Sequence, residues 1–318
     1  MASLRSKLFQ FVIRNRNYFQ FKFRRTPEIT WETSVSELRL KTEKASTMFG
    51  KLPKGILISE LEINGIYSEK LYPAEKESEK IILYFHGGGY VIGSARGHRI
   101  HVAKIVNLSG IPAVTFDYGL GPEKPFPAGL NDSINVYNYL LDNGYRSENI
   151  IFMGDSAGGG LVLATLLALK ERTIPLPKAA IVLSPWTDLK NTGESLKKNE
   201  SVDFLTWRES WTIFSEYYRG GESPENPLVS PLYGDLSSLP PLKIFVGSDE
   251  LLLDDSVRFA QKAKAAGVDV SLVIGEGMFH CYPVCAPIFP EATAAMSELV
   301  TFLQAQLEVN EVPEAVLS

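Results

Sequence analysis

The sequence predicts an α/β fold, in which helices cover both faces of a mostly parallel central sheet. Short apolar runs have the composition of buried parallel strands, and they cover residues 81–85, 113–116, 150–153, 179–183, 243–246 and 270–274. Helical patterns lie between them, at residues 97–109, 128–141, 157–170, 255–266 and 291–306. Strands that alternate with helices in this way form a parallel sheet with a helical layer on each side. An earlier segment, residues 57–63, alternates apolar and polar residues as a half-buried strand does.

Two segments fall outside this alternation. Residues 186–240 contain no clear strand, but they hold the aromatic residues Trp207, Trp211, Phe214, Tyr217 and Tyr218. The first fifty residues are helical in pattern, polar and charged. We therefore predict that residues 186–240 form an inserted helical cap, and that N-terminal cap helices at residues 1–50 join it. Residues 51–185 and 241–318 then form the α/β domain.

Composition narrows the class of protein. The chain has 318 residues, of which 45 % are hydrophobic and 22 % charged, as in a soluble globular protein, and its net charge of −5 predicts no nucleic-acid partner. The two cysteines, Cys281 and Cys285, are too few for a disulfide framework, so we expect reduced thiols and a cytoplasmic protein. His98 and His101 have no Cys, Asp or Glu near them in sequence, so no metal site is expected.

The N-terminal segment is basic and amphipathic. Residues 1–27 contain seven Lys or Arg residues and no acidic residue. Leu4, Leu8, Phe11 and Val12 recur at helical spacing, which predicts an amphipathic helix. Two interpretations are open: the helix packs on the rest of the protein, or it contacts a lipid surface. No apolar stretch in the chain has the length of a signal-peptide core or of a membrane span.

The strongest local signal is a strand–turn–helix motif around Ser156. Residues 150–160 read IIFMGDSAGGG, so a buried strand leads into the pattern Gly-x-Ser-x-Gly, and a long apolar helix follows. In this context a tight turn presents the serine hydroxyl as a nucleophile. Gly154 and Gly158 have no Cβ, so the strand and the helix can approach the turn closely. Ala157 opens the helix, and its amide can stabilise negative charge that develops on a bound substrate.

A second glycine-rich loop supplies candidate backbone donors. Residues 83–90 read LYFHGGGY, so three glycines follow a histidine at the end of a strand. Acyl transfer creates an oxyanion that needs N–H donors, and glycines let the backbone approach it without a side chain in the way. A phosphate-binding loop is excluded, because neither the G-K-[ST] nor the G-x-G-x-x-G pattern is present. We predict an oxyanion hole formed by Gly87, Gly88 and Ala157, with His86 in a structural role.

A serine nucleophile needs an adjacent base and an acidic residue that orients the base. In the fold that carries this motif the chain order is Ser, then Asp or Glu, then His, and only His280 follows Ser156. Among the aspartates between them, Asp249 closely follows a buried apolar run, at the carboxyl end of a strand. Asp254 and Asp255 fit better as caps of the next helix. The predicted triad is Ser156, Asp249 and His280.

With these residues in place, the chain resembles the hormone-sensitive-lipase-like esterases, the bacterial type IV members of the α/β-hydrolase fold. The resemblance covers roughly residues 81–306, and its motifs are HGGG at 86–89, GDSAGG at 154–159, Asp249 with LLDD at 252–255, and GMFH at 277–280. The stretch DYGLGPEKPFPA at 117–128 is also similar. There the family usually has Arg in place of Gly119 and Ala in place of Gly121, so the local side-chain network differs.

The resemblance implies a carboxylesterase that acts on small-molecule, short-acyl esters without a cofactor. It also implies a helical cap, and a homodimer is consistent with it. Large aromatic residues are candidates for contact with the substrate, namely Tyr90, Trp186, Trp207 and Phe279. Two alternatives remain open: an amidase or peptidase that uses the same triad, and a hydrolase-like protein that binds its ligand without catalysis.

Overall fold

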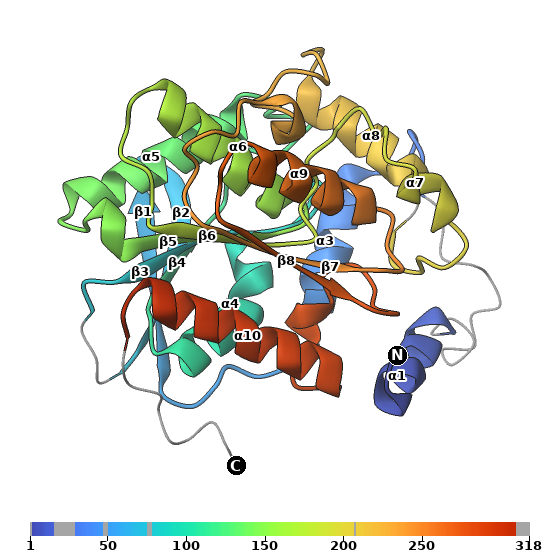
Figure 1. The fold of residues 1–318 in the computed structure, drawn as a ribbon, viewed down its shortest axis with the longest axis horizontal. Helices are drawn as coiled ribbons and strands as arrows, with labels where there is room; N and C mark the ends of the chain where they lie inside the picture. Colours follow the sequence, from blue (N-terminus) through green and yellow to red (C-terminus); the bar gives the residue numbers. More distant parts are fainter. Residues whose placement is uncertain (1, 16–28, 47–49, 75–77, 207, 310–318) are drawn as a thin grey trace.

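The computed structural model describes residues 2–15, 29–46, 50–74, 78–206 and 208–309, and it confirms the predicted α/β fold (Figure 1). The strands are β1 (Ile56–Ile63), β2 (Ile66–Pro73), β3 (Ile81–Phe85), β4 (Ala113–Phe116), β5 (Ile150–Asp155), β6 (Ala179–Leu183), β7 (Leu242–Gly247) and β8 (Val270–Gly275). The α-helices are α1 (Leu4–Arg14), α3 (Val35–Ser46), α4 (Ala95–Ser109), α5 (Ala128–Asp142), α6 (Ala157–Glu171), α7 (Ser195–Lys198), α8 (Arg208–Arg219), α9 (Leu253–Ala265) and α10 (Pro290–Gln306). Short 3-10 turns are η2 (Ser147–Asn149), η3 (Pro231–Tyr233) and η4 (Tyr282–Cys285).

The eight strands form one sheet in the order β1-β2-β4-β3-β5-β6-β7-β8. All neighbours from β4 to β8 are parallel, whereas β2 pairs antiparallel with both β1 and β4. β1 and β2 make a hairpin whose turn residues, Asn64 and Gly65, both have positive φ, at 52° and 81°. An Asn-Gly pair of this kind closes a two-residue hairpin with the twist that the strands require.

A separate hydrophobic core lies on each face of the sheet. On one face α5, α6 and α9 pack over the strands, and on the other face α4 and α10 do so (Figure 1). Because β3, β5, β6, β7 and β8 are parallel, their carboxyl ends meet at one edge of the sheet. In open parallel sheets this edge is where ligand sites lie.

The segment predicted to form a cap contains α7, α8 and η3, and no strand occurs in its described residues. The N-terminal helices separate from each other: α3 contacts α4, whereas α1 packs beside α10. The division of the chain into an α/β domain and a cap stays a prediction. None of the helices that the structure describes combines the length and the apolar character needed to cross a bilayer.

Candidate active site

Ser156 occupies the turn between β5 and α6, as the motif predicts. Its backbone is in a strained region, with φ 55° and ψ −122°, which aims the side chain away from the sheet. The turn fits because the residues two positions before and after Ser156, Gly154 and Gly158, have no Cβ. A Cβ on Gly158 would lie 2.2 Å from the carbonyl oxygen of Phe85, and a Cβ on Gly154 would lie 2.7 Å from the carbonyl group of Gly158.

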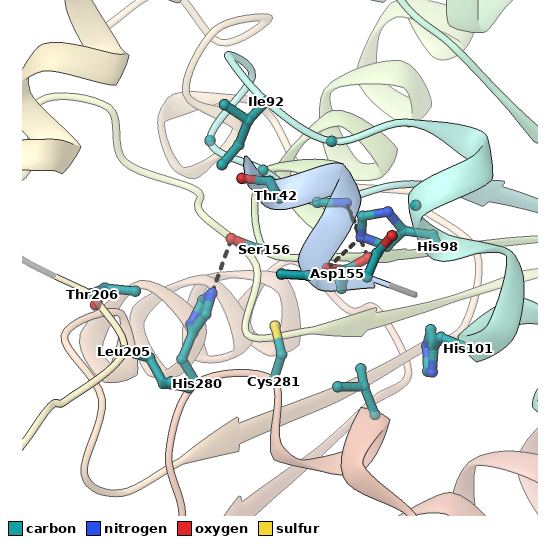
Figure 2. Close-up of a pocket in the computed structure, with 18 of the residues that line it drawn as sticks. Thr42, Ile92, His98, His101, Asp155, Ser156, Leu205, Thr206, His280 and Cys281 are labelled. Atoms are coloured by element: carbon teal, nitrogen blue, oxygen red, sulfur yellow. Dashed lines mark hydrogen bonds and ion pairs between the residues drawn. The ribbon is translucent and has the colours of Figure 1, made fainter. Parts of the chain in front are cut away.

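His280 lies within hydrogen-bond distance of Ser156. Its Nε2 is 3.0 Å from Ser156 Oγ, and Figure 2 shows the two side chains pointing toward each other. The ring reaches this position from the loop that follows β8, 124 residues further along the chain than Ser156. The structure therefore brings together the serine and the histidine that the sequence pairs.

The carboxylate that contacts His280 belongs to Glu250 and not to the predicted Asp249. Glu250 Oε1 lies 2.9 Å from His280 Nδ1. Asp249 is one residue earlier, and its carboxylate accepts a hydrogen bond from Ser248 Oγ at 2.7 Å instead. Successive residues of the turn after β7 point in different directions, and the pattern that predicted the turn does not specify which of them faces the histidine.

Glu250 is fixed in place by its second carboxylate oxygen. Oε2 accepts hydrogen bonds from the Gly247 amide at 2.8 Å and from the Ser184 hydroxyl at 2.7 Å. The side chain is fully buried, so its charge is compensated by these donors and by His280 rather than by water. The chain order of the fold admits either acid, so the sequence pattern does not distinguish Glu250 from Asp249.

The charge state of His280 is set by its neighbours. Burial by itself disfavours the imidazolium, whereas the Glu250 carboxylate favours it, and the pKa of His280 is raised above its ordinary value. The Cys281 thiol is itself buried, and burial raises its pKa. Both cysteines are free thiols, and both are buried.

The glycine loop after β3, Gly87 to Gly89, lies beside Ser156, but the amide of its first residue already donates a hydrogen bond within the protein. Gly87 N–H donates to Asp155 Oδ1 at 3.0 Å, so the prediction that Gly87 stabilises an oxyanion is wrong. Within the part of the chain that the structure describes, the amides of Gly88, Gly89 and Ala157 have no protein acceptor, and Gly88 and Gly89 line the pocket. The available donors are therefore those of Gly88, Gly89 and Ala157.

Asp155 ties the glycine loop to the sheet. Its Oδ1 also accepts a hydrogen bond from Tyr84 Oη at 2.8 Å, and its Oδ2 lies 3.5 Å from His98 Nε2 (Figure 2). Burial alone raises the pKa of Asp155, but His98 and Tyr84 outweigh it, so the pKa is held well below its usual range. The variable position of the Gly-x-Ser-x-Gly motif thus fixes the orientation of Gly87, and with it the two glycines that follow.

A pocket of about 460 Å³ lies over Ser156 and His280. Its walls come from the glycine loop, from α3, from α8 and from the segment before α8, through the apolar side chains Leu38, Ile92, Leu205, Trp211 and Phe214. A largely apolar pocket over a nucleophile suits the hydrocarbon part of a substrate.

The aromatic residues predicted to contact substrate do not line this pocket. Tyr90 stacks on Tyr218 with the ring centroids 3.8 Å apart, and Trp186 packs against Trp211. Phe279 packs against Phe9 and Phe289. All three are buried in the core and none of them lines the pocket, so the structure does not place them against a substrate. The fourth, Trp207, lies outside the described residues.

The histidines on α4 contact Asp155 and Tyr84. No group of three or more His, Cys, Asp or Glu side chains among those residues is placed to hold a metal ion. His98 faces Asp155, and His101 packs edge-on against Tyr84 with its ring centroid 5.6 Å away.

The chain is similar to known proteins in sequence and in structure. A family model described as the alpha/beta hydrolase fold matches residues 82–284. An acetyl-hydrolase from Streptomyces hygroscopicus is 35 % identical over 282 residues, which cover 87 % of this chain and 93 % of that protein. An esterase from Acinetobacter venetianus is 34 % identical, over 83 % of this chain and 87 % of its own. The crystal structure of an esterase from the bacterial hormone-sensitive lipase family has a TM-score of 0.88 at 38 % identity, and the match covers 96 % of this chain and 99 % of that one.

Proposed function

We propose that this chain cleaves short-acyl esters with Ser156 as its nucleophile. The chain belongs to the α/β-hydrolase family, among the esterases of the bacterial hormone-sensitive lipase group, and it is a carboxylic ester hydrolase. The observation that carries the assignment of roles is the chain of contacts from Ser156 Oγ through His280 to Glu250. The name of the Streptomyces relative, an acetyl-hydrolase, supports a short acyl group.

In the proposed mechanism, His280 Nε2 takes the proton of Ser156 as Oγ attacks the ester carbonyl. The amides of Gly88, Gly89 and Ala157 donate to the oxyanion of the tetrahedral intermediate. Glu250 accepts the hydrogen bond from Nδ1–H and stabilises the imidazolium. His280 then protonates the departing alcohol, and a water molecule activated by the same histidine hydrolyses the acyl-enzyme.

Covalent labelling tests this function directly. A serine-directed phosphonate is expected to modify the enzyme with a stoichiometry of one, because Ser156 Oγ is the nucleophile that His280 activates. Mass spectrometry of the digested protein should place the adduct on Ser156. A protein that binds the probe reversibly and forms no adduct would instead be a ligand-binding relative of the hydrolases.

A matched pair of substrates separates the esterase from an amidase or peptidase on the same triad. Acyl length is varied in p-nitrophenyl esters, and each ester is compared with the corresponding p-nitroanilide. The proposal expects kcat/KM to be highest for the short-acyl esters and far lower for every amide. Comparable values for the two series would favour the amidase.

The pH dependence of kcat/KM should report the raised pKa of His280. The histidine must be neutral to accept the proton, and it is protonated below its pKa, so activity falls as pH decreases through that value. Because the pKa is raised, the midpoint of the acid limb should lie above 6.5, the ordinary value for histidine. Circular dichroism over the same range checks that the protein stays folded, and a midpoint at or below 6.5 would contradict a raised pKa for His280.

Two predicted partners go beyond the comparisons. We propose that residues 1–27 contact a lipid surface, for which the basic character of that segment is the support. The homodimer stays a prediction that comes from the family resemblance alone, and the cytoplasmic compartment stays a prediction that comes from the two reduced cysteines.

A further inference from the structure

Helix α1 buries two polar side chains and exposes an apolar stripe. The side chains that it buries against the protein are Ser6, at 0 % exposure, and Gln10, at 8 %. The side chains of Leu4, Leu8 and Val12 face outward, with 83 %, 62 % and 42 % of their surface exposed. Residues four apart lie above one another on a helix, so these three form one apolar stripe. A surface helix ordinarily turns such a stripe toward the core.

Specific contacts hold the helix in this orientation. Gln10 Nε2 donates to the carbonyl oxygen of Gly277 at 2.9 Å and to Ser6 Oγ at 3.1 Å. Ser3 Oγ donates to Glu291 Oε2 of α10 at 2.8 Å. Turning the leucines inward would break these hydrogen bonds and would leave the Gln10 side-chain amide without its partners. The outward apolar stripe therefore belongs to the folded state.

The same helix touches two segments that border the active site. Phe9 stacks on the ring of Phe279, the residue before His280, with the centroids 5.8 Å apart. At the other end of the helix, Arg14 donates to the carbonyl oxygen of Val202 at 2.9 Å, a few residues before Leu205, which lines the pocket. Whatever binds the outward face of α1 therefore lies close to the catalytic loop and to the pocket wall.

The basic side chains of α1 indicate which kind of surface binds its outward face. Arg5, Lys7 and Arg14 are exposed on α1, and residues 1–27 contain no acidic residue, although the whole chain has a net charge of −5. An apolar stripe flanked by basic side chains matches an anionic lipid surface. A second copy of the helix would bring like charges together, which disfavours self-association through this face.

We propose that the outward face of α1, formed by Leu4, Leu8 and Val12 with Arg5 and Lys7, docks on an anionic lipid surface and places the pocket beside it. The helix inserts its leucines shallowly, and its basic residues contact lipid phosphates. This inference deepens the proposed function, because it names the surface at which ester substrates reach the pocket. It does not depend on the identity of the catalytic residues.

Vesicle co-sedimentation of the full chain tests the proposal. The protein should pellet with phosphatidylcholine vesicles that contain phosphatidylglycerol, and it should stay in the supernatant with pure phosphatidylcholine. The double variant Leu4→Gln/Leu8→Gln should lower the partition coefficient at least about tenfold, because two leucine side chains no longer leave water on binding. Leu40→Gln is the matched control, since Leu40 on α3 is 63 % exposed but lies outside α1, and it should bind as the unmodified protein does.

Hydrolysis of water-soluble p-nitrophenyl acetate is measured on the same samples. The leucine variants should retain it, which separates lipid docking from the ester hydrolysis itself. If the leucine variant misfolds, Arg5→Gln/Lys7→Gln tests the same face through its charge, and its binding should be weakened and less sensitive to salt. Equal sedimentation of all variants, or no binding to the anionic vesicles, would overturn the proposal. So would a dimer that Leu4→Gln/Leu8→Gln abolishes in the absence of any vesicle binding.

Discussion

Replacing Ser156 by alanine is expected to lower kcat for a short-acyl ester about a millionfold, to the level left by binding and oxyanion contacts alone. The variant removes only Oγ, the atom that lies 3.0 Å from His280 Nε2. No other described hydroxyl lies within hydrogen-bond distance of that nitrogen. The loss should therefore appear in kcat, with KM changed much less.

The variant should fold as the unmodified protein does. The strained φ of 55° is a property of the backbone, and alanine has the same Cβ as serine. The backbone bonds at this turn also remain: Ser156 N donates to Leu183 O at 2.8 Å, and Trp186 N donates to Ser156 O at 3.1 Å. Ser256→Ala is a matched control, because it removes a buried hydroxyl that has no partner among the described residues. Full esterase activity in Ser156→Ala would reject the proposed mechanism.

The parallel part of the fold could be predicted because its strands are buried on both faces. Such strands consist of nearly continuous apolar residues, so each strand from β3 to β7 is visible as a short run without knowledge of its neighbours. The helices between them are visible from their length and apolar spacing: α4, α5, α9 and α10 turn one apolar stripe toward a sheet face, whereas α6 is buried almost all round.

β2 could not be predicted in this way. Its sequence places Ser68, Glu69 and Lys70 in the middle of the strand, and Glu69 is fully buried. The burial is tolerated because Arg99 on α4 pairs with the Glu69 carboxylate and Tyr67 Oη donates to it. Arg99 is distant in sequence, and Tyr67 lies on the same face of the strand as Glu69. Neither contact can be recognised from a pattern of apolar residues.

In the site, the motifs predicted Ser156 and His280, but not the geometry around them. Ser156 is defined by a local turn, and His280 by being the only histidine downstream. Which glycine amide is free depends on Asp155, whose carboxylate accepts the amide of Gly87, and that contact appears only in three dimensions. The pocket walls likewise come from α3 and α8, far from the motifs, while the aromatic residues near the motifs fill the core.

The second prediction tests whether Glu250 is the acid that orients His280. Glu250→Gln is expected to lower kcat about 10⁴-fold, as loss of the orienting carboxylate does in related triads. The Gly247 amide and the Ser184 hydroxyl both donate to Oε2, so an introduced amide keeps its oxygen there. Its NH₂ group then replaces Oε1 and donates to His280 Nδ1. The proton of the imidazole moves to Nε2, which can no longer accept the proton of Ser156.

Asp249→Asn is the matched control, because it makes the same chemical change one residue earlier. Asn can still accept the hydrogen bond from Ser248 Oγ, and the Asp249 amide bond to Met278 O is unaffected, so kcat/KM should change little. Both variants are compared by steady-state kinetics on one short-acyl ester, and their thermal unfolding midpoints check for misfolding. A large loss in Asp249→Asn together with a small loss in Glu250→Gln would restore the assignment that the sequence alone favours. The opposite result would show that side-chain direction within a two-residue turn, and not position after the strand, selects the catalytic acid.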